Sequence, residues 1–99
     1  MHVISPKTLR EFWETHPQAR EPLRAWRVVA HAATWQTFVD VRERFPSADL
    51  VGRLTVFNIS GNNYRLIVRI EFTLQRIYVR HVLTHAEYDK ERWKNDPWY

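Results

Sequence analysis

The spacing of hydrophobic residues changes once along this chain of 99 residues. Up to about residue 45 they recur every three or four positions, as in amphipathic helices. From residue 54 onward they alternate with polar residues, as in half-buried strands. The first part therefore predicts a short strand followed by three helices, at residues 2–5, 6–16, 21–33 and 38–45.

Polar residues suited to capping mark the start of two of these helices. Ser5 precedes Pro6 and is predicted to cap the first helix with its side chain. Thr37 with Asp40 has the residue types of a capping pair. Residues 47–52 follow neither period and are predicted to be a loop.

The second part of the chain predicts a meander of three antiparallel strands, at residues 54–59, 64–72 and 76–84. The turn residues Ser60 to Asn63 between the first two strands are typical of a hairpin. We expect one sheet face to pack on the helices and the other to stay open. The predicted open face carries Arg65, Arg69 and Arg80, and His81 is predicted to pack on the apolar side.

These elements predict an α+β fold with a small, mostly antiparallel sheet, N-terminal helices on one face and a short helix after residue 84. At this length we expect a single domain, residues 1–99. The chain has no cysteine, so a disulfide framework or a thiolate zinc site is impossible. It has neither an apolar run long enough for a membrane span nor an apolar signal-peptide core, so we expect no membrane association and a cytoplasmic location.

Positive charge is concentrated on the predicted sheet. Residues 53–85 contain five arginines and only one acidic residue, a net charge of +4 that equals the charge of the whole chain. A localised patch of arginines favours a polyanionic partner over a merely solubilising surface. A second basic strip at helical spacing (Arg20, Arg24, Arg27 and His31) fits a solvated face, ribosomal RNA or an acidic partner equally well.

Residues 84–88 combine a helix cap with groups that suit acid–base chemistry. Thr84 and Glu87 form a capping box, which places His85 at the first helical position and Tyr88 one turn later. The backbone N–H groups of this helix start and Arg65 on the neighbouring strand could bind a phosphate. His85 could exchange a proton with a ribose 2′-hydroxyl, and Tyr88 could orient that hydroxyl or stack on a base. Together they predict metal-independent cleavage of RNA, without a cofactor.

Each of these residues also has an ordinary structural explanation. A histidine at a helix start is more often a surface residue, a tyrosine a packing residue and a strand arginine an ion-pair partner. The spacing of His81 and His85 would suit a metal on one helix, but His81 belongs to a strand, so we expect no metal site.

The segments PSADLVG, VFNISGNNYRLIV and YVRHVLTHAEYDK resemble the HigB toxins of type II toxin–antitoxin systems, within the RelE-like ribonuclease superfamily. The resemblance covers essentially the whole chain, including MHVIS at its start. It implies an mRNA endoribonuclease, or interferase, that acts on the translating ribosome, in the A site. It also implies a HigA-like helix-turn-helix antitoxin, through which alone the toxin would reach operator DNA.

On this resemblance Arg65, His85 and Tyr88 are the expected catalytic residues. The lysines that RelE-like toxins carry on the strand before the YRL motif are absent here, which leaves the general base open. The residues that we expect to contact RNA around the site are Arg53, Asn58, Arg69, Arg80 and Lys90. Two alternatives are a non-catalytic RNA- or ribosome-binding module and an adaptor for an acidic protein.

Overall fold

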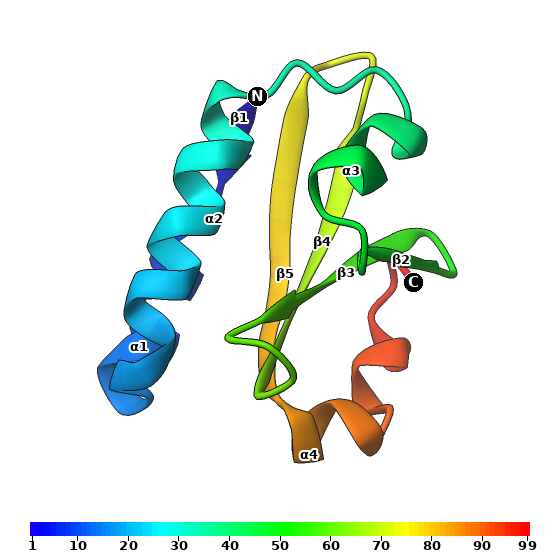
Figure 1. Ribbon diagram of the computed structural model, residues 1–99. Coiled ribbons are helices and arrows are strands. Elements are labelled where there is room, and N and C mark those ends of the chain that lie inside the picture. Colours follow the sequence, from blue (N-terminus) through cyan, green and yellow to red (C-terminus); the bar gives the residue numbers. More distant parts are fainter.

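A computed structural model describes residues 1–99 and shows a five-stranded sheet with the N-terminal helices on one face (Figure 1). The strand order is β1-β5-β4-β3-β2. The three predicted central strands are β3 (Leu54–Ile59), β4 (Tyr64–Glu71) and β5 (Arg76–Thr84), joined as an antiparallel meander. The predicted α+β fold is confirmed.

Short strands extend the meander at both edges. The predicted N-terminal strand, β1 (His2–Ile4), pairs in parallel with the first residues of β5. β2 (Asp49–Val51) pairs antiparallel with β3, so the prediction of a loop over residues 47–52 is wrong for this segment. Gly52 adopts a left-handed conformation with φ of 61°, which lets the chain turn directly from β2 into β3.

Three helices precede the meander: α1 (Pro6–Thr15), α2 (Arg20–Ala32) and α3 (Phe38–Arg44), with a 3-10 turn at Pro17–Ala19. At α3 the predicted capping pair is confirmed, since the Asp40 carboxylate accepts the Thr37 N–H at 3.3 Å. At α1 the prediction is wrong: Ser5 has a φ of 67° and its side chain makes no capping hydrogen bond. No helix is long and apolar enough to cross a membrane.

The helix-facing side of the sheet holds the main core. Even-numbered residues of β4 point into it, as the alternation predicted, together with Leu9, Leu23 and Trp26 from the helices. Phe57 of β3 packs edge-to-face against Trp26, with ring centres 5.5 Å apart. Because this core fixes β4 from one side, its odd-numbered residues are held on the opposite face.

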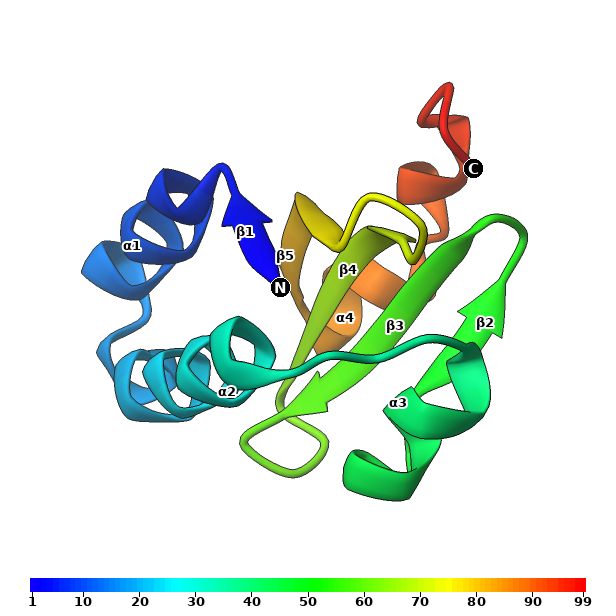
Figure 2. The same cartoon turned by 90° about the horizontal axis from the view of Figure 1, so that it is seen from above.

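The opposite face is covered rather than open, which corrects the prediction. After β5 the chain forms α4 (His85–Asp89) and a 3-10 turn, η2 (Arg92–Asn95), and continues across the sheet to Tyr99. Figure 2 shows α2 and α3 on one side of the sheet and this C-terminal segment on the other. Trp93, 5% exposed, forms a second apolar cluster with Leu54, Val56 and Ile67.

A bulge in β5 changes which of its residues face the helices. Ile67 pairs with His81 but Val68 pairs with Val79, so β5 has one extra residue here. Beyond the bulge, Val82 belongs to the main core while Leu83 packs with the second cluster. His81 therefore lies on the side of the C-terminal segment, where it binds Asp96, and not on the main apolar face as predicted.

Candidate functional site

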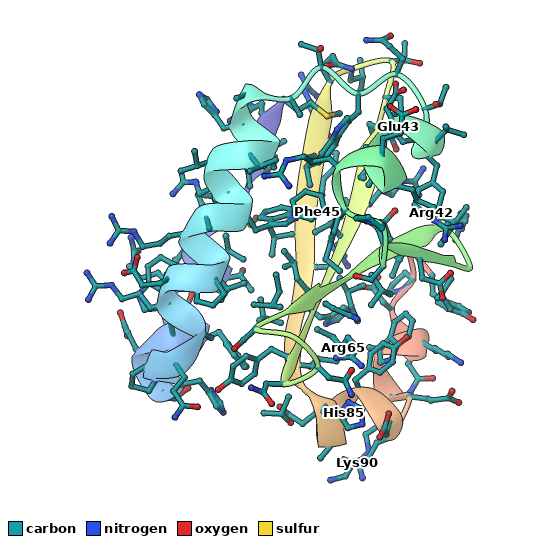
Figure 3. All side chains as sticks on the ribbon, viewed as in Figure 1. Arg42, Glu43, Phe45, Arg65, His85 and Lys90 are labelled. Atoms are coloured by element: carbon teal, nitrogen blue, oxygen red, sulfur yellow. The ribbon has the colours of Figure 1, made fainter.

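The β3–β4 turn and the start of α4 bring Arg65, His85 and Tyr88 together. β4 starts directly after the turn at Ser60 to Asn63. Arg65 is the second residue of β4 and pairs with Leu83 near the end of β5. The Thr84 side chain accepts the Glu87 N–H at 3.2 Å, and the Glu87 carboxylate accepts the Thr84 N–H at 3.0 Å. This confirmed capping box starts α4 beside Arg65 (Figure 3).

Arg65 is the only charged residue among the buried residues, at 8% exposure. Its Nη1 donates to the carbonyl oxygens of Asn62 and Tyr64 at 3.0 and 3.2 Å, and its Nη2 donates to the Asn62 side-chain oxygen. No carboxylate lies within 4 Å of it. The guanidinium is thus fixed in place but its charge is not neutralised by the protein.

The His85 imidazole bridges Arg65 and Asp89. Its Nδ1 lies 3.3 Å from Arg65 Nη2, and its Nε2 lies 3.1 Å from Asp89 Oδ2. Because a guanidinium only donates, Nδ1 must accept, and the proton sits on Nε2, where it is donated to the carboxylate. The side chain is 46% exposed, so a substrate can reach this ring.

Tyr88 packs between the arginine and the C-terminal segment. Its ring stacks on Trp93 at 5.3 Å between ring centres, and the Arg65 guanidinium carbon lies 5.3 Å from its centre. Both contacts occupy the ring, which leaves little surface for stacking on a base. Burial raises the pKa of the Tyr88 hydroxyl, although Arg65 acts in the opposite direction. The hydroxyl therefore keeps its proton at neutral pH and acts as a hydrogen-bond donor.

The start of α4 is less available to an anion than the sequence suggested. The His85 N–H donates to the Asn63 carbonyl at 3.0 Å, and the Glu87 N–H donates to Thr84. Two of the backbone groups that were expected to bind phosphate are therefore engaged within the protein. Positive charge at the site comes from the Arg65 side chain instead.

Of the five residues predicted to contact RNA, two lie near Arg65 and three lie elsewhere. The strand register places Asn58 directly opposite Arg65, and Lys90 lies at the same end of the molecule as Arg65 and His85 (Figure 3). Two arginines lie elsewhere in ion pairs: Arg69 Nε is 2.8 Å from Glu71, and Arg80 donates two hydrogen bonds to Asp96.

Arg53 is exposed but interacts with the C-terminal residues. Its N–H donates to the Tyr99 carbonyl at 2.8 Å and its Nη2 to the Pro97 carbonyl at 3.0 Å. It therefore helps to hold the C-terminal segment on the sheet.

Sequence reasoning missed three residues that fix this arrangement. Asn62 holds the Arg65 guanidinium, and Asp89 holds the His85 imidazole. The spacing of four residues between His85 and Asp89 on a helix was a usable signal for the second of these contacts. Asp96 binds Arg80 and His81, but nothing in the sequence indicates a contact between residues so far apart along the chain.

Comparisons with known proteins agree with this structure. Residues 19–91 match the HigB_toxin family, described as the RelE-like toxic component of a toxin–antitoxin system. The chain is 33% identical over 92 residues to the mRNA interferase toxin HigB of Escherichia coli K12, covering 90% of this chain and 88% of that protein. It is 32% identical over 93 residues to the mRNA interferase HigB of Escherichia coli O6:H1, covering 91% and 90%. Both the family match and the matches to these relatives cover most of the chain. The chain therefore belongs to the HigB toxin family of toxin–antitoxin systems.

Proposed function

We propose that this protein is an endoribonuclease that cleaves mRNA by metal-independent acid–base chemistry at Arg65, His85 and Tyr88. The observation that carries the proposal is the buried Arg65, whose charge no carboxylate balances and which contacts an imidazole and a phenol ring. Burying a cation without a counter-charge lowers stability, and such groups are characteristic of sites that bind an anion. Its HigB relatives are named mRNA interferases, which favours an RNA phosphate as this anion.

In the proposed reaction Arg65, His85 and Asp89 each have a role, while the Tyr88 ring contacts the Arg65 guanidinium. A phosphate oxygen takes the hydrogen bond that Arg65 Nη2 now directs at His85, so Nδ1 becomes free to accept the proton of the ribose 2′-hydroxyl. The 2′ oxygen then bonds to phosphorus as the bond from phosphorus to the 5′ oxygen breaks, which leaves a 2′,3′-cyclic phosphate. The departing 5′ oxygen takes a proton from water, and the His85 imidazolium returns its proton to the hydroxide that remains. Asp89 stabilises the imidazolium that forms, and Arg65 stabilises the charge on the phosphate.

We further propose the partners that the resemblance to HigB toxins implies. The protein acts in the cytoplasm on mRNA in the ribosomal A site, and a HigA-like helix-turn-helix antitoxin inhibits it and brings it to operator DNA. Co-expression of such an antitoxin should restore growth. Asn58, Lys90 and the remaining arginines Arg53, Arg69 and Arg80 are proposed contacts to RNA, of which Asn58 and Lys90 lie nearest the site.

Substitution of the central residues tests this function. We expect His85→Gln and Arg65→Gln to lower the cleavage rate by a factor of about 100 or more, the usual contribution of a proton-transfer group or an oxyanion donor. Arg76→Gln is the matched control, since Arg76 is exposed and lies at the other end of β5. Cleavage is followed by mapping the 5′ ends of transcripts in induced cells, and folding by circular dichroism.

The alternative of a non-catalytic RNA-binding module makes a different prediction. A binder would slow growth while leaving transcripts intact, and His85→Gln would remain toxic. An RNA oligonucleotide with a single 2′-deoxy nucleotide at the mapped cleavage position adds a chemical test. If that substrate were still cut, attack by the 2′-hydroxyl would be refuted.

A further inference from the structure

A hollow of about 300 Å³ lies between β5 and the C-terminal segment. It is lined by His81, Leu83, Glu87, Lys90, Arg92 and Trp93. We propose that this hollow binds a second phosphate of the RNA strand whose scissile phosphate contacts Arg65. The inference rests on the proposed function and adds to it a position for the substrate beyond the cleaved bond.

The cations of the hollow are not neutralised by the protein. Lys90 and Arg92 are both exposed, and neither has a carboxylate within 4 Å. Nearby Lys94, in contrast, is bound to Glu91 at 2.8 Å. Glu87 contributes a negative charge, but its carboxylate is directed to the Thr84 N–H in the capping box. The lining therefore retains a net positive charge in a concave site, which suits a single phosphate.

When its ring is protonated, His81 adds a donor that is held in one orientation. Its Nε2 lies 2.7 Å from Asp96 Oδ2, and the Asp96 side chain is only 1% exposed. Asp96 is itself fixed by Arg80 and by the Trp98 N–H at 2.8 Å. The imidazole is thus held on one side, while its Nδ1 has no protein partner. In the protonated ring this Nδ1–H donates to a phosphate oxygen, and Asp96 stabilises the charge.

The hollow is close enough to Arg65 for one RNA strand to reach both. Leu83, which lines the hollow, is the cross-strand partner of Arg65, and His81 pairs with Ile67. Arg65 and His81 are therefore diagonal neighbours on the same sheet face, a relation that separates residues by about 7–8 Å. The apolar surfaces of Leu83 and Trp93 offer a wall for a ribose. An acidic side chain of a protein partner is the competing occupant.

The double substitution Lys90→Gln/Arg92→Gln tests the proposal. Its matched control is Lys7→Gln/Arg10→Gln, which removes the same charge from two exposed positions of α1. Binding is measured by fluorescence anisotropy with 2′-O-methyl RNA oligonucleotides, which lack the attacking hydroxyl, from two nucleotides upward. We expect the Lys90/Arg92 variant to bind the longer oligonucleotides about tenfold more weakly and the dinucleotide as the parent does. The slope of log affinity against log salt should fall by about 0.7, as for one phosphate contact on a single strand.

Each other outcome overturns the inference. Equal losses in both double variants would show a general charge effect. Unchanged RNA affinity together with weaker inhibition by the antitoxin would assign the hollow to a protein partner. In another result, the parent cleaves transcripts in cells while the Lys90/Arg92 variant still gains as much affinity from longer oligonucleotides as the parent does. That result would refute only the second phosphate site. If the parent neither binds nor cleaves RNA, the proposed function is refuted and this inference with it.

Discussion

Asp96 joins the C-terminal segment to β5, and its replacement by Asn should weaken this attachment and lower the stability of the fold. The carboxylate accepts two hydrogen bonds from Arg80, one from His81 at 2.7 Å and one from the Trp98 N–H. Asn has nearly the same shape but only one acceptor oxygen and no charge. Its NH₂ group would face the Arg80 guanidinium, so that two donors meet and the arginine loses its counter-charge.

The expected cost follows from how deeply these groups are buried. Removing one partner of a fully buried ion pair costs about 3–5 kcal/mol. The Asp96 side chain is 1% exposed, but those of Arg80 and His81 are 28% and 30% exposed, so water partly compensates them. We therefore expect Asp96→Asn to lower the free energy of unfolding by about 2–3 kcal/mol, or the melting temperature by roughly 10–20 °C in a domain of this size.

Urea unfolding followed by tryptophan fluorescence measures this change. Both proteins carry His85→Ala, so that toxicity does not limit expression. Glu71→Gln is the matched control, because it breaks the more exposed Arg69–Glu71 pair and should cost less than about 1 kcal/mol. If Asp96→Asn cost no more than this control, the argument that the buried carboxylate fixes the C-terminal segment would be refuted.

The pH dependence of the unfolding free energy is a second, independent test of the role of Asp96. Hydrogen bonds, chiefly from Arg80, hold the pKa of Asp96 well below its ordinary value of 3.8. A group with a lowered pKa stabilises the fold above its unfolded pKa, and this stability is lost as the pH falls through the folded pKa. The parent should therefore lose this contribution progressively below about pH 4. The Asp96→Asn variant should lack that part of the acid-induced loss, with the difference between the two proteins shrinking as the pH falls.

Three further substitutions test the packing of Tyr99 and the cap of α4. Gly52 and Gly61 both have positive φ, but only at Gly52 would an added Cβ lie 2.6 Å from the Tyr99 carbonyl oxygen. Both Ala variants should therefore lose about 1 kcal/mol of unfolding free energy through backbone strain. In thermal unfolding, Gly52→Ala should lose at least about 1 kcal/mol more because its Cβ meets Tyr99. Equal losses in the two variants would show that Tyr99 can move aside without cost. Thr84→Ala removes the cap of α4 and should cost about 1 kcal/mol. If the cap positions the site, the cleavage rate should fall with it, while unchanged cleavage would show that packing alone holds the helix.

The sequence predicted those features that depend on neighbours along the chain. The β3–β4 hairpin, its turn and the alternation of β4 are all local patterns, and all three are present. The capping box at Thr84 and Glu87 is also local, and it was sufficient to place His85 and Tyr88 on the side of Arg65. Local sequence patterns were therefore enough to predict that these three side chains lie close together.

Features that depend on distant residues were not predictable in this way. The bulge in β5 shifts the alternation after Val79, so a strict period of two assigned His81 to the wrong face. β2 is short and its residues are mostly exposed, so its only signal is the pairing with β3. The closure of the second sheet face depends on contacts that Trp93 and Asp96 make with the strands. Trp93 packs on Leu54, Val56 and Ile67, and Asp96 binds Arg80 and His81, all at least 15 residues away in sequence.

The two sheet arginines Arg65 and Arg80 differ in how the protein balances their charges. Both are partly or fully buried, and in sequence both appear as strand arginines on a polar face. Arg80 is neutralised by Asp96 and lies 4.0 Å from the centre of the Trp98 ring, an arrangement that needs no ligand. Arg65 is more deeply buried, yet only neutral oxygens and an imidazole nitrogen accept its hydrogen bonds. A buried cation without a counter-charge lowers stability, and at Arg80 the Asp96 carboxylate removes that cost. On the proposed function, a substrate phosphate supplies the negative charge that is missing at Arg65.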